Sequence, residues 1–146
     1  MNLPGLPDYR ATCNRYDACI ADEHTTLSNG GDFAQRVRAT ATQLHQLGVV
    51  PGSVVAVQLR NRVELIVVLF AGWRLGAAVT PVNPNLTDFE TEHQLRDSGA
   101  VVLVGDARPL PSFDGAYLDV ADLATTVDVG APDSVHNPPT GKSWRC

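Results

Sequence analysis

The clearest pattern in the chain is a run of apolar residues spaced three or four positions apart. Its members are Phe33, Val37, Ala41, Leu44 and Leu47. This spacing places them on one face of an α-helix. Ser28 or Asn29 can cap the amino end of that helix, and Gly48 suits the left-handed position after its last turn. The pattern therefore predicts an amphipathic helix that ends at Gly48 and is followed by a turn at Pro51 and Gly52.

The next two apolar segments differ in length and in kind. Residues 54–59 form a β-branched apolar run between turn residues, which is typical of a buried strand. Residues 63–75 are apolar almost all round and too long for an ordinary strand, so we expect a buried helix that ends at Gly76. We expect Asn61 to cap this helix and Glu64 to answer it, as in a capping box.

Two further strands and one capped helix complete the regular pattern. Strands are expected over residues 77–82 and 101–104. Between them, Thr87 and Glu90 have the spacing of a capping box, which begins a helix that Gly99 ends. Strands and helices that alternate through short links are typical of a parallel sheet. The sequence therefore predicts an α/β fold with a parallel-sheet βαβαβ core.

The residues before the amphipathic helix lack this regularity. Residues 1–17 are expected to be an irregular segment, because Pro4 and Pro7 limit helix formation. Residues 18–21 and 25–27 are short stretches that fit two strands joined by a turn. The sequence predicts a loose amino-terminal segment followed by a small hairpin.

The pattern weakens again after the last predicted strand of the core, where prolines interrupt the chain. Residues 116–120 fit one more strand, and residues 133–146 show no apolar period. We therefore expect an irregular segment at 1–17, an α/β subdomain at 18–106 and a weakly structured extension at 107–146.

Charge and hydropathy exclude two classes of partner. The 146 residues carry 11 basic and 16 acidic side chains, for a net charge of −5. A surface for nucleic-acid phosphates needs a basic stripe, so no nucleic-acid partner is expected. The longest uncharged apolar run, residues 65–73, falls short of the ~20 residues that a membrane-spanning helix needs, so no membrane span is expected.

Two further features favour a cytoplasmic location. Residues 1–15 lack the basic and apolar regions of a secretory signal. The three cysteines, Cys13, Cys19 and Cys146, are odd in number and have no metal-ligand spacing, so we expect free thiols in a reducing compartment.

No set of residues in the sequence has the arrangement of a catalytic, cofactor-binding or metal site. Gly141, Lys142 and Ser143 resemble the end of a phosphate-binding loop, but His136 stands where that loop needs a glycine. No G-x-G-x-x-G sequence follows a predicted strand. The residues alone therefore assign no catalytic residue, no cofactor ligand and no metal ligand.

The histidines and clustered carboxylates have simple structural explanations. The four histidines, His24, His45, His93 and His136, stand apart in the sequence and fit surface or half-buried positions. Glu90, Glu92 and Asp97 lie on one predicted helix, where capping, the helix dipole and solvation account for them.

Two ordered segments resemble the beginning of a known enzyme superfamily. Residues 47–56, LGVVPGSVVA, resemble the L-G-V-x-P-G-D-x-V-A stretch of adenylate-forming enzymes. That superfamily contains acyl-CoA synthetases, peptide-synthetase adenylation domains and luciferases. Asn61, Glu64 and the run 69–78 resemble the N-x-x-E … A-x-x-x-x-G-A helix of the same superfamily.

Two more segments extend the resemblance in the same order. Residues 81–87, PVNPNLT, are similar to the P-x-N-P-x-x-T turn of the superfamily. Residues 92–100, EHQLRDSGA, are particularly like bacterial long-chain fatty-acid–CoA ligases and their aryl-CoA relatives. The resemblance covers residues 18–106. It departs at residues 28–33, SNGGDF, where relatives have T-Y-x-E-L, and this puts the first turn of the helix in doubt.

The resemblance implies the amino-terminal portion of an enzyme that activates a carboxylic acid. In the full-length family ATP and Mg²⁺ form an acyl-adenylate, which the thiol of coenzyme A then attacks. The family's phosphate loop, adenine site, ribose aspartate and catalytic lysine come from later elements. None of these occurs here, and residues 137–142 have the wrong order for the phosphate loop. We therefore expect a truncated fatty-acid–CoA ligase that is inactive by itself and carries no cofactor of its own.

Two other functions are consistent with the sequence. The apolar helix over residues 63–75 could belong to a stand-alone α/β interaction module that needs a neighbour to cover it. A small flavodoxin-like nucleotide binder has less support, because no phosphate-cradling loop follows a predicted strand. The partner of a truncated ligase would be a complementary ligase fragment or a second copy of the chain.

Overall fold

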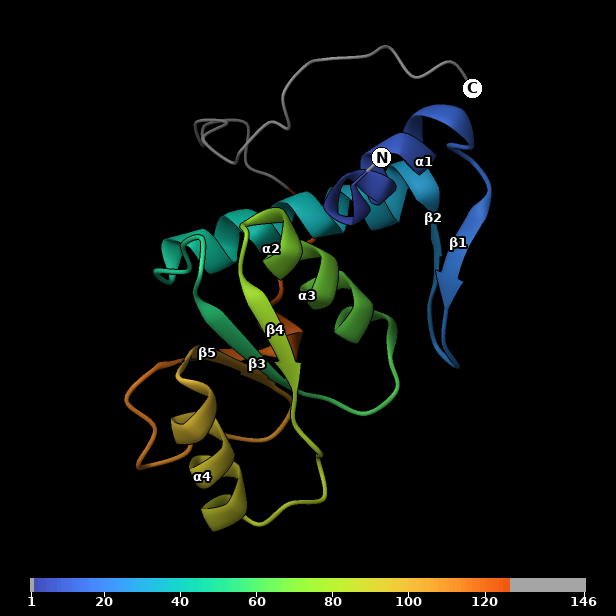
Figure 1. Ribbon diagram of the computed structural model, residues 1–146. Coiled ribbons are helices and arrows are strands. Elements are labelled where there is room, and N and C mark those ends of the chain that lie inside the picture. Colours follow the sequence, from blue (N-terminus) through green and yellow to red (C-terminus); the bar gives the residue numbers. More distant parts are fainter. Residues whose placement is uncertain (1, 127–146) are drawn as a thin grey trace.

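A four-stranded sheet lies at the centre of the computed structural model, which describes residues 2–126 (Figure 1). A two-stranded hairpin lies beside it. The elements, in chain order, are a 3-10 turn at Leu3–Gly5, α1 at Leu6–Cys13, β1 at Ala18–Ala21, β2 at Thr26–Ser28, a π-helical turn at Asn29–Phe33, α2 at Ala34–Gln46, β3 at Val54–Gln58, α3 at Val63–Arg74, β4 at Ala78–Pro81, α4 at Asp88–Ser98, β5 at Ala100–Gly105, β6 at Ala116–Asp119 and a 3-10 turn at Val120–Asp122.

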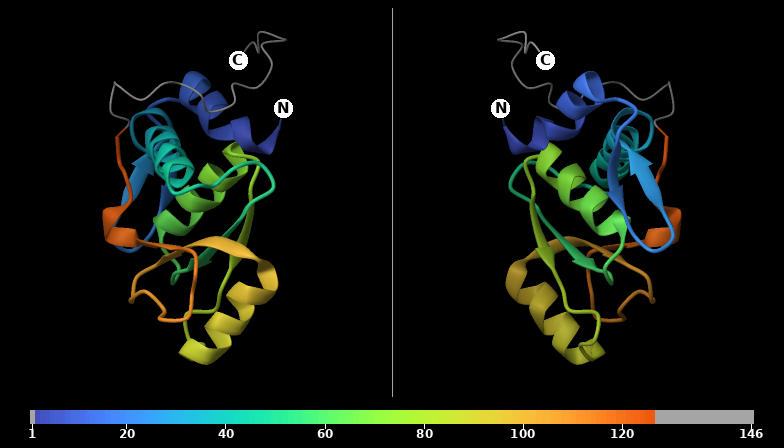
Figure 2. Two further views of the ribbon diagram at one scale, coloured as in Figure 1. Left: turned by 90° about the vertical axis from the view of Figure 1, so that its left-hand side faces the viewer. Right: turned by 90° about the vertical axis from the view of Figure 1, so that its right-hand side faces the viewer.

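The central sheet is parallel throughout. Its strand order is β4-β3-β5-β6, and Val54 of β3 pairs with Ala78 of β4 and Ala100 of β5. Helices α2 and α3 lie on one face and α4 lies on the other (Figure 2). This confirms the parallel-sheet α/β fold that the alternation of strands and helices predicts.

The larger core lies between the sheet and helices α2 and α3. Alternate residues of each strand point to this face, because side chains alternate along a strand. The cluster includes Val55, Val57, Val102, Val104 and Leu44, all nearly or wholly buried. The predicted apolar face of α2 is therefore confirmed. Only its last member, Leu47, is exposed, because the helix ends at Gln46.

A smaller core fills the other face of the sheet. Ala56 and Leu103, which alternate with the residues of the first core, pack there against Leu95 of α4. The capping box predicted at the start of α4 is present: Glu90 N–H donates to Thr87 Oγ1 at 3.3 Å, and Thr87 N–H donates to the Glu90 carboxylate at 2.9 Å. Gly99 ends the helix with φ of 66°, as predicted.

Helix α3 lies unusually close to β4 at Gly72. A Cβ atom at position 72 would lie 2.4 Å from Cγ2 of Val79. Real Cβ atoms do not approach other atoms so closely, so glycine sets the spacing between this helix and the sheet.

The amino-terminal segment is helical, so the predicted irregular conformation is wrong over residues 3–13. Pro7 lies in the first turn of α1, where its missing N–H costs no hydrogen bond and its fixed φ suits a helix. Asp8 of α1 pairs with Arg38 of α2 at 2.7 Å and with Arg74 of α3. The prolines thus begin the helix instead of preventing it.

The predicted hairpin is present. β1 and β2 are antiparallel, with an irregular register between Ala18 and Ile20. Leu27 of β2 packs with Phe33 and with Val63 and Val67 of α3, which joins the hairpin to the helices.

The amino end of α2 differs from a regular helix start. The residues Asn29–Phe33, which include the two glycines, form a π-helical turn, and the α-helix begins at Ala34. Ser28 stands at the cap position of the π-turn, but its side chain caps no backbone N–H; its N–H and hydroxyl donate to Asp32 at 3.1 and 3.0 Å.

The chain after β6 returns over α2. The side-chain amide of Gln43 donates to the carbonyl of Asp122 at 2.8 Å and accepts from the N–H of Ala124 at 2.8 Å. The strand predicted over residues 116–120 is confirmed as β6. Within residues 2–126, no helix is both long and apolar enough to cross a bilayer. Residues 127–146 lie outside the described residues.

Candidate functional site

The sheet topology indicates where a ligand site would be expected. In open parallel sheets, ligands bind beyond the carboxyl ends of two neighbouring strands from which the chain leaves in opposite directions. Here those strands are β3 and β5, because the chain passes from β3 to β4 at one edge and from β5 to β6 at the other.

The side chains at that position do not form a cradle for a ligand. Arg60 and Asn61 follow β3, and Asp106 follows β5; all three are exposed. Gln58, the last residue of β3, donates its side-chain amide to the Asn83 carbonyl at 3.3 Å and to the hydroxyl of Thr91 at 3.1 Å. The Gln58 side-chain amide therefore holds α4 against the sheet instead of pointing toward a ligand.

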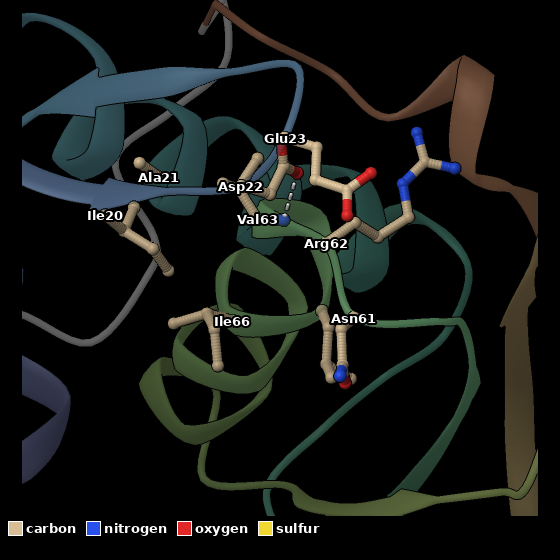
Figure 3. Close-up of a pocket in the computed structure, with 9 residues that line it drawn as sticks. Ile20, Ala21, Asp22, Glu23, Asn61, Arg62, Val63 and Ile66 are labelled. Atoms are coloured by element: carbon tan, nitrogen blue, oxygen red, sulfur yellow. Dashed lines mark hydrogen bonds between the residues drawn. The ribbon is translucent and has the colours of Figure 1, made fainter.

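The amino end of α3, the helix that follows β3, already holds a carboxylate. Oδ2 of Asp22 accepts from Val63 N–H at 2.9 Å (Figure 3). Oδ1 of the same carboxylate accepts from His24 N–H and Thr25 N–H, both at 2.8 Å. The hydrogen bond from Val63, followed by that from His24, holds the pKa of Asp22 below its ordinary value of 3.8. A carboxylate at this helix end would repel a phosphate group, so these residues do not fit the triphosphate of ATP.

The predicted cap of α3 is wrong. Arg62 stands at the cap position and makes no capping hydrogen bond, whereas Asn61 is exposed one residue earlier. Glu64 pairs with Arg62 at 2.9 Å instead of forming the reciprocal capping-box hydrogen bond with Asn61. Asp22 takes the capping role because the hairpin brings it to the helix end, and a residue 41 positions away cannot be found from local spacing.

A pocket of about 350 Å³ lies between the hairpin and the first two turns of α3 (Figure 3). Ile20, Ala21, Val63, Leu65 and Ile66 line its apolar part, and Asp22, Glu23, Asn61 and Arg62 line its polar part. Both oxygens of the Asp22 carboxylate accept hydrogen bonds, three in all, from backbone N–H groups. The Arg62 guanidinium is paired with Glu64. The pocket therefore has an apolar floor but no free ionic group except Glu23.

The exposed side of α4 carries a second, smaller hollow of about 220 Å³. Phe89, Glu92, His93 and Arg96 line it. His93 lies 3.4 Å from Asp97 on the next turn, and Glu92 accepts from the N–H of Ser112 at 3.2 Å. Two predictions about α4 are confirmed: Glu90 takes part in the capping box, and His93 is exposed.

The remaining sequence candidates do not come together. His24 and His45 are exposed, and His45 Nδ1 contacts the Val49 carbonyl at 3.2 Å. Within residues 2–126, no group of three His, Cys, Asp or Glu residues could hold a metal ion. His136 and the trio 141–143 lie outside the described residues.

The two described cysteines differ in state. Cys19 is free and exposed, as predicted, and loss of solvation raises the pKa of its thiol. Cys13 is disulfide-bonded, so the prediction of a free thiol is wrong there. Disulfides depend on proximity in space, which sequence spacing does not reveal.

The sheet, the helices and the side chains at the strand ends together define the class of this protein. The chain is a parallel α/β unit with a helical amino-terminal segment, and its described residues provide structure without a nucleotide cradle. The family model for AMP-binding enzymes matches residues 7–141. The chain belongs to this family of adenylate-forming enzymes.

Curated relatives come from several kinds of CoA ligase. The chain is 36% identical over 104 residues to 2-succinylbenzoate–CoA ligase of Geobacillus kaustophilus, a match that covers 67% of this chain and 21% of the relative. It is 41% identical over 137 residues to 4-coumarate–CoA ligase 5 of Oryza sativa, covering 90% of this chain and 24% of the relative. It is 45% identical over 71 residues to a long-chain-fatty-acid–CoA ligase of Yersinia pestis, covering 48% and 13%.

Solved structures show the same fold. The N-terminal subdomain of NpsA from Klebsiella oxytoca matches with a TM-score of 0.73 at 19% identity, covering 89% of this chain and 34% of that one. The O-succinylbenzoate coenzyme A synthetase of Bacillus subtilis, in complex with AMP, matches with a TM-score of 0.68 at 26% identity, covering 84% and 34%. The chain thus spans about a fifth to a quarter of the first two relatives (21% and 24%).

Proposed function

We propose that this chain is the amino-terminal portion of a fatty-acid–CoA ligase that activates its acid through an acyl-adenylate. The observation that carries this proposal is the family match over residues 7–141, joined to a fold shared with N-terminal subdomains of adenylate-forming enzymes. The choice of a fatty acid is supported by the 45% identity over 71 residues to the Yersinia pestis ligase. Residues 92–100 carry the same resemblance.

The role of this portion is structural support for the chemistry. Two packed faces cover the sheet of β3, β4, β5 and β6, and Gln58 at the carboxyl end of β3 binds α4. The full-length family uses ATP, Mg²⁺ and coenzyme A. The amino end of α3, which follows β3, does not fit the triphosphate, because the Asp22 carboxylate occupies it. Adenylyl transfer needs fixed donors for the developing charge, and we expect the chain by itself to form no adenylate.

A pyrophosphate-exchange assay tests whether the lone chain is inactive. Purified chain, ATP, Mg²⁺ and oleate are incubated with labelled pyrophosphate, and label entering ATP is counted. We expect no exchange above a blank without acid. Exchange that depends on the acid would show that the chain binds and activates ATP, and would disprove the proposed inactivity while leaving family membership intact.

Grafted enzymes test the choice of acid. Residues 18–106 replace the matching segment in the Yersinia pestis fatty-acid ligase and, as a matched graft, in the Oryza sativa 4-coumarate ligase. We expect acyl-CoA formation to survive better in the fatty-acid ligase, because the interior contacts of that segment suit it. Better survival in the coumarate ligase would favour an aromatic acid.

A complementary ligase fragment is the proposed partner, and the cytoplasm is the proposed compartment. A polypeptide that carries the phosphate loop would supply the groups that this chain lacks. Co-expression with the carboxyl-terminal remainder of the Yersinia pestis ligase, followed by affinity purification and the same exchange assay, tests the partner. Light scattering of the lone chain tests the alternative, self-association.

A further inference from the structure

Two arginines from different helices share a single carboxylate at the amino-terminal end of the fold. Arg38 of α2 donates to Oδ1 of Asp8 at 2.7 Å, and Arg74 of α3 donates to Oδ2 of the same group. Among the residues that the structure describes, neither guanidinium is paired with a second carboxylate. Two positive charges therefore face one negative charge.

The segment that carries Asp8 is attached by few apolar contacts. Pro7 is the only buried residue of α1, the 3-10 turn before it has none, and Leu3 is 54% exposed. The other firm attachments lie at the far end of α1, where Cys13 is disulfide-bonded, and just beyond it, where the side-chain amide of Asn29 donates to the carbonyl of Asn14 at 2.8 Å. Segments with few buried apolar contacts open at a small free-energy cost. The amino-terminal half of this segment can therefore swing away while its carboxyl end stays in place.

The arginines themselves are held by the body of the protein. They belong to α2 and α3, whose inner faces form the main core, and α1 lies across these two helices (Figures 1 and 2). The Arg38 side chain is 40% exposed and that of Arg74 is 15% exposed. One guanidinium is therefore open to solvent and the other is partly shielded from it, which strengthens its interaction with an anion.

We propose that Arg38 and Arg74 form a binding site for a phosphate monoester dianion, in which Asp8 is an internal occupant. A phosphate monoester carries about −1.5 to −2 charges at pH 7 and so matches two guanidinium groups better than one carboxylate does. Arginine binds phosphate through paired N–H donors in a planar arrangement. Binding displaces Asp8 and opens the strap, which we define as residues 3–10, ahead of the disulfide-bonded Cys13.

A free monocarboxylate is a poor competitor at this site. Asp8 is tethered to the arginines, and a tether raises its effective concentration to the order of millimolar. A free monoanion interacts with the two guanidinium groups no more strongly than Asp8 does, so it cannot overcome the high effective concentration of Asp8. A dianion can, because its second charge adds a further interaction with the arginines. The site therefore favours dianions over monoanions. This preference does not depend on the proposed ligase function.

The test compares inorganic phosphate binding to the wild-type chain and to Asp8→Asn by titration calorimetry. The variant removes the competing charge with little change of shape, so we expect it to bind phosphate roughly tenfold more tightly. Arg74→Gln in the Asp8→Asn background should remove that gain. Asp88→Asn, which breaks the ion pair between Asp88 of α4 and Arg108 after β5, is the matched control and should leave phosphate affinity unchanged.

A second measurement keeps the proposal testable if Asp8→Asn does not fold. Hydrogen exchange of the wild-type amides over residues 3–10 should rise with phosphate, but not with chloride at the same ionic strength, which controls for screening. The proposal is wrong if Asp8→Asn binds no more tightly than wild type. It is also wrong if Arg74→Gln keeps the gain, or if phosphate leaves exchange of the strap unchanged.

Discussion

The carboxylate of Asp22 in the hairpin accepts a hydrogen bond from the backbone N–H of Val63, the first residue of α3, at 2.9 Å and across 41 residues of sequence. The same side chain closes the hairpin turn through the N–H groups of His24 and Thr25. One carboxylate thus forms the turn and caps the helix. The hairpin and the amino end of α3 are therefore expected to unfold together.

Replacing Asp22 with alanine is expected to destabilise the protein at neutral pH. The variant leaves three backbone N–H groups without their acceptor. Because these bonds lower the pKa of Asp22 below 3.8, the stabilisation is complete above that pH. It is lost as the pH falls through the folded-state pKa. Urea unfolding of wild type and variant across pH 2 to 7 should show two curves that converge in acid.

Glu23→Ala is the control for this pH dependence. Glu23 is the neighbouring carboxylate, is exposed, and lines the same pocket. Its removal should change stability little at any pH. A pH-independent loss in Asp22→Ala would contradict the capping role.

Gly72→Ala is expected to destabilise the fold by overpacking. The new methyl group would lie 2.4 Å from Cγ2 of Val79, so the Val79 side chain, helix α3 or strand β4 must move. Overpacking of this kind costs about 1–3 kcal/mol. Chemical denaturation of Gly72→Ala, Val79→Ala and the double variant measures it. The double variant should be less destabilised than the sum of the two single variants, and simple additivity would disprove the steric explanation.

Thr87→Ala is expected to cost about 1 kcal/mol of stability, the usual value for loss of a helix cap. The variant removes the acceptor for Glu90 N–H and the hydroxyl that donates to the Glu90 carboxylate at 2.8 Å. Thr87→Ser keeps both interactions and should remain near wild type. Equal losses in the two variants, measured by urea unfolding, would assign the effect to the methyl group.

Gln43→Ala is expected to release the segment after β6 from α2. Each of the two hydrogen bonds that Gln43 makes with this segment contributes about 1 kcal/mol in typical cases. Hydrogen exchange at the Ala124 amide should rise in the variant. Gln46→Ala, at the exposed end of the same helix, should leave that amide protected. No change at Ala124 in Gln43→Ala would contradict the tether.

The sequence predicts the core of this fold because the core depends on local pattern. The apolar spacing of α2, the length of α3 and the Thr87–Glu90 capping box all lie within about a dozen residues each. Their physical causes are helix periodicity, burial and end capping, which adjacent residues determine. These elements, and the parallel sheet that they imply, are confirmed.

The errors arise where distant residues replace a local partner. Asn61 has the right spacing to cap α3, but the cap comes from Asp22 in the hairpin. The polar residues after 18–21 indicate a turn, and aspartate favours turns, so the place of Asp22 in the hairpin is predictable from the sequence. Its hydrogen bond to the first residue of α3 is not, because the two residues are far apart in the chain. In the sequence pattern Pro7 indicates an interruption of helix, but in the first turn of α1 a proline is favourable.

The candidate site was harder to predict than the fold, since its residues act through tertiary contacts. Gln58 is an ordinary strand residue in the sequence, and only the packed structure brings its amide to Thr91. Asp8 likewise has no pattern that connects it with Arg38 and Arg74, which lie 30 and 66 residues further along the chain.

A single hydrogen atom at position 72 fixes how deeply α3 settles onto the edge of the sheet. Two residues further along the same helix, Arg74 reaches Asp8 on the strap. A larger side chain at position 72 must displace the Val79 side chain or lift the helix, and a lifted helix would carry that guanidinium outward with it. The position of the arginine that holds Asp8 thus depends on how closely α3 packs against β4 at its single glycine.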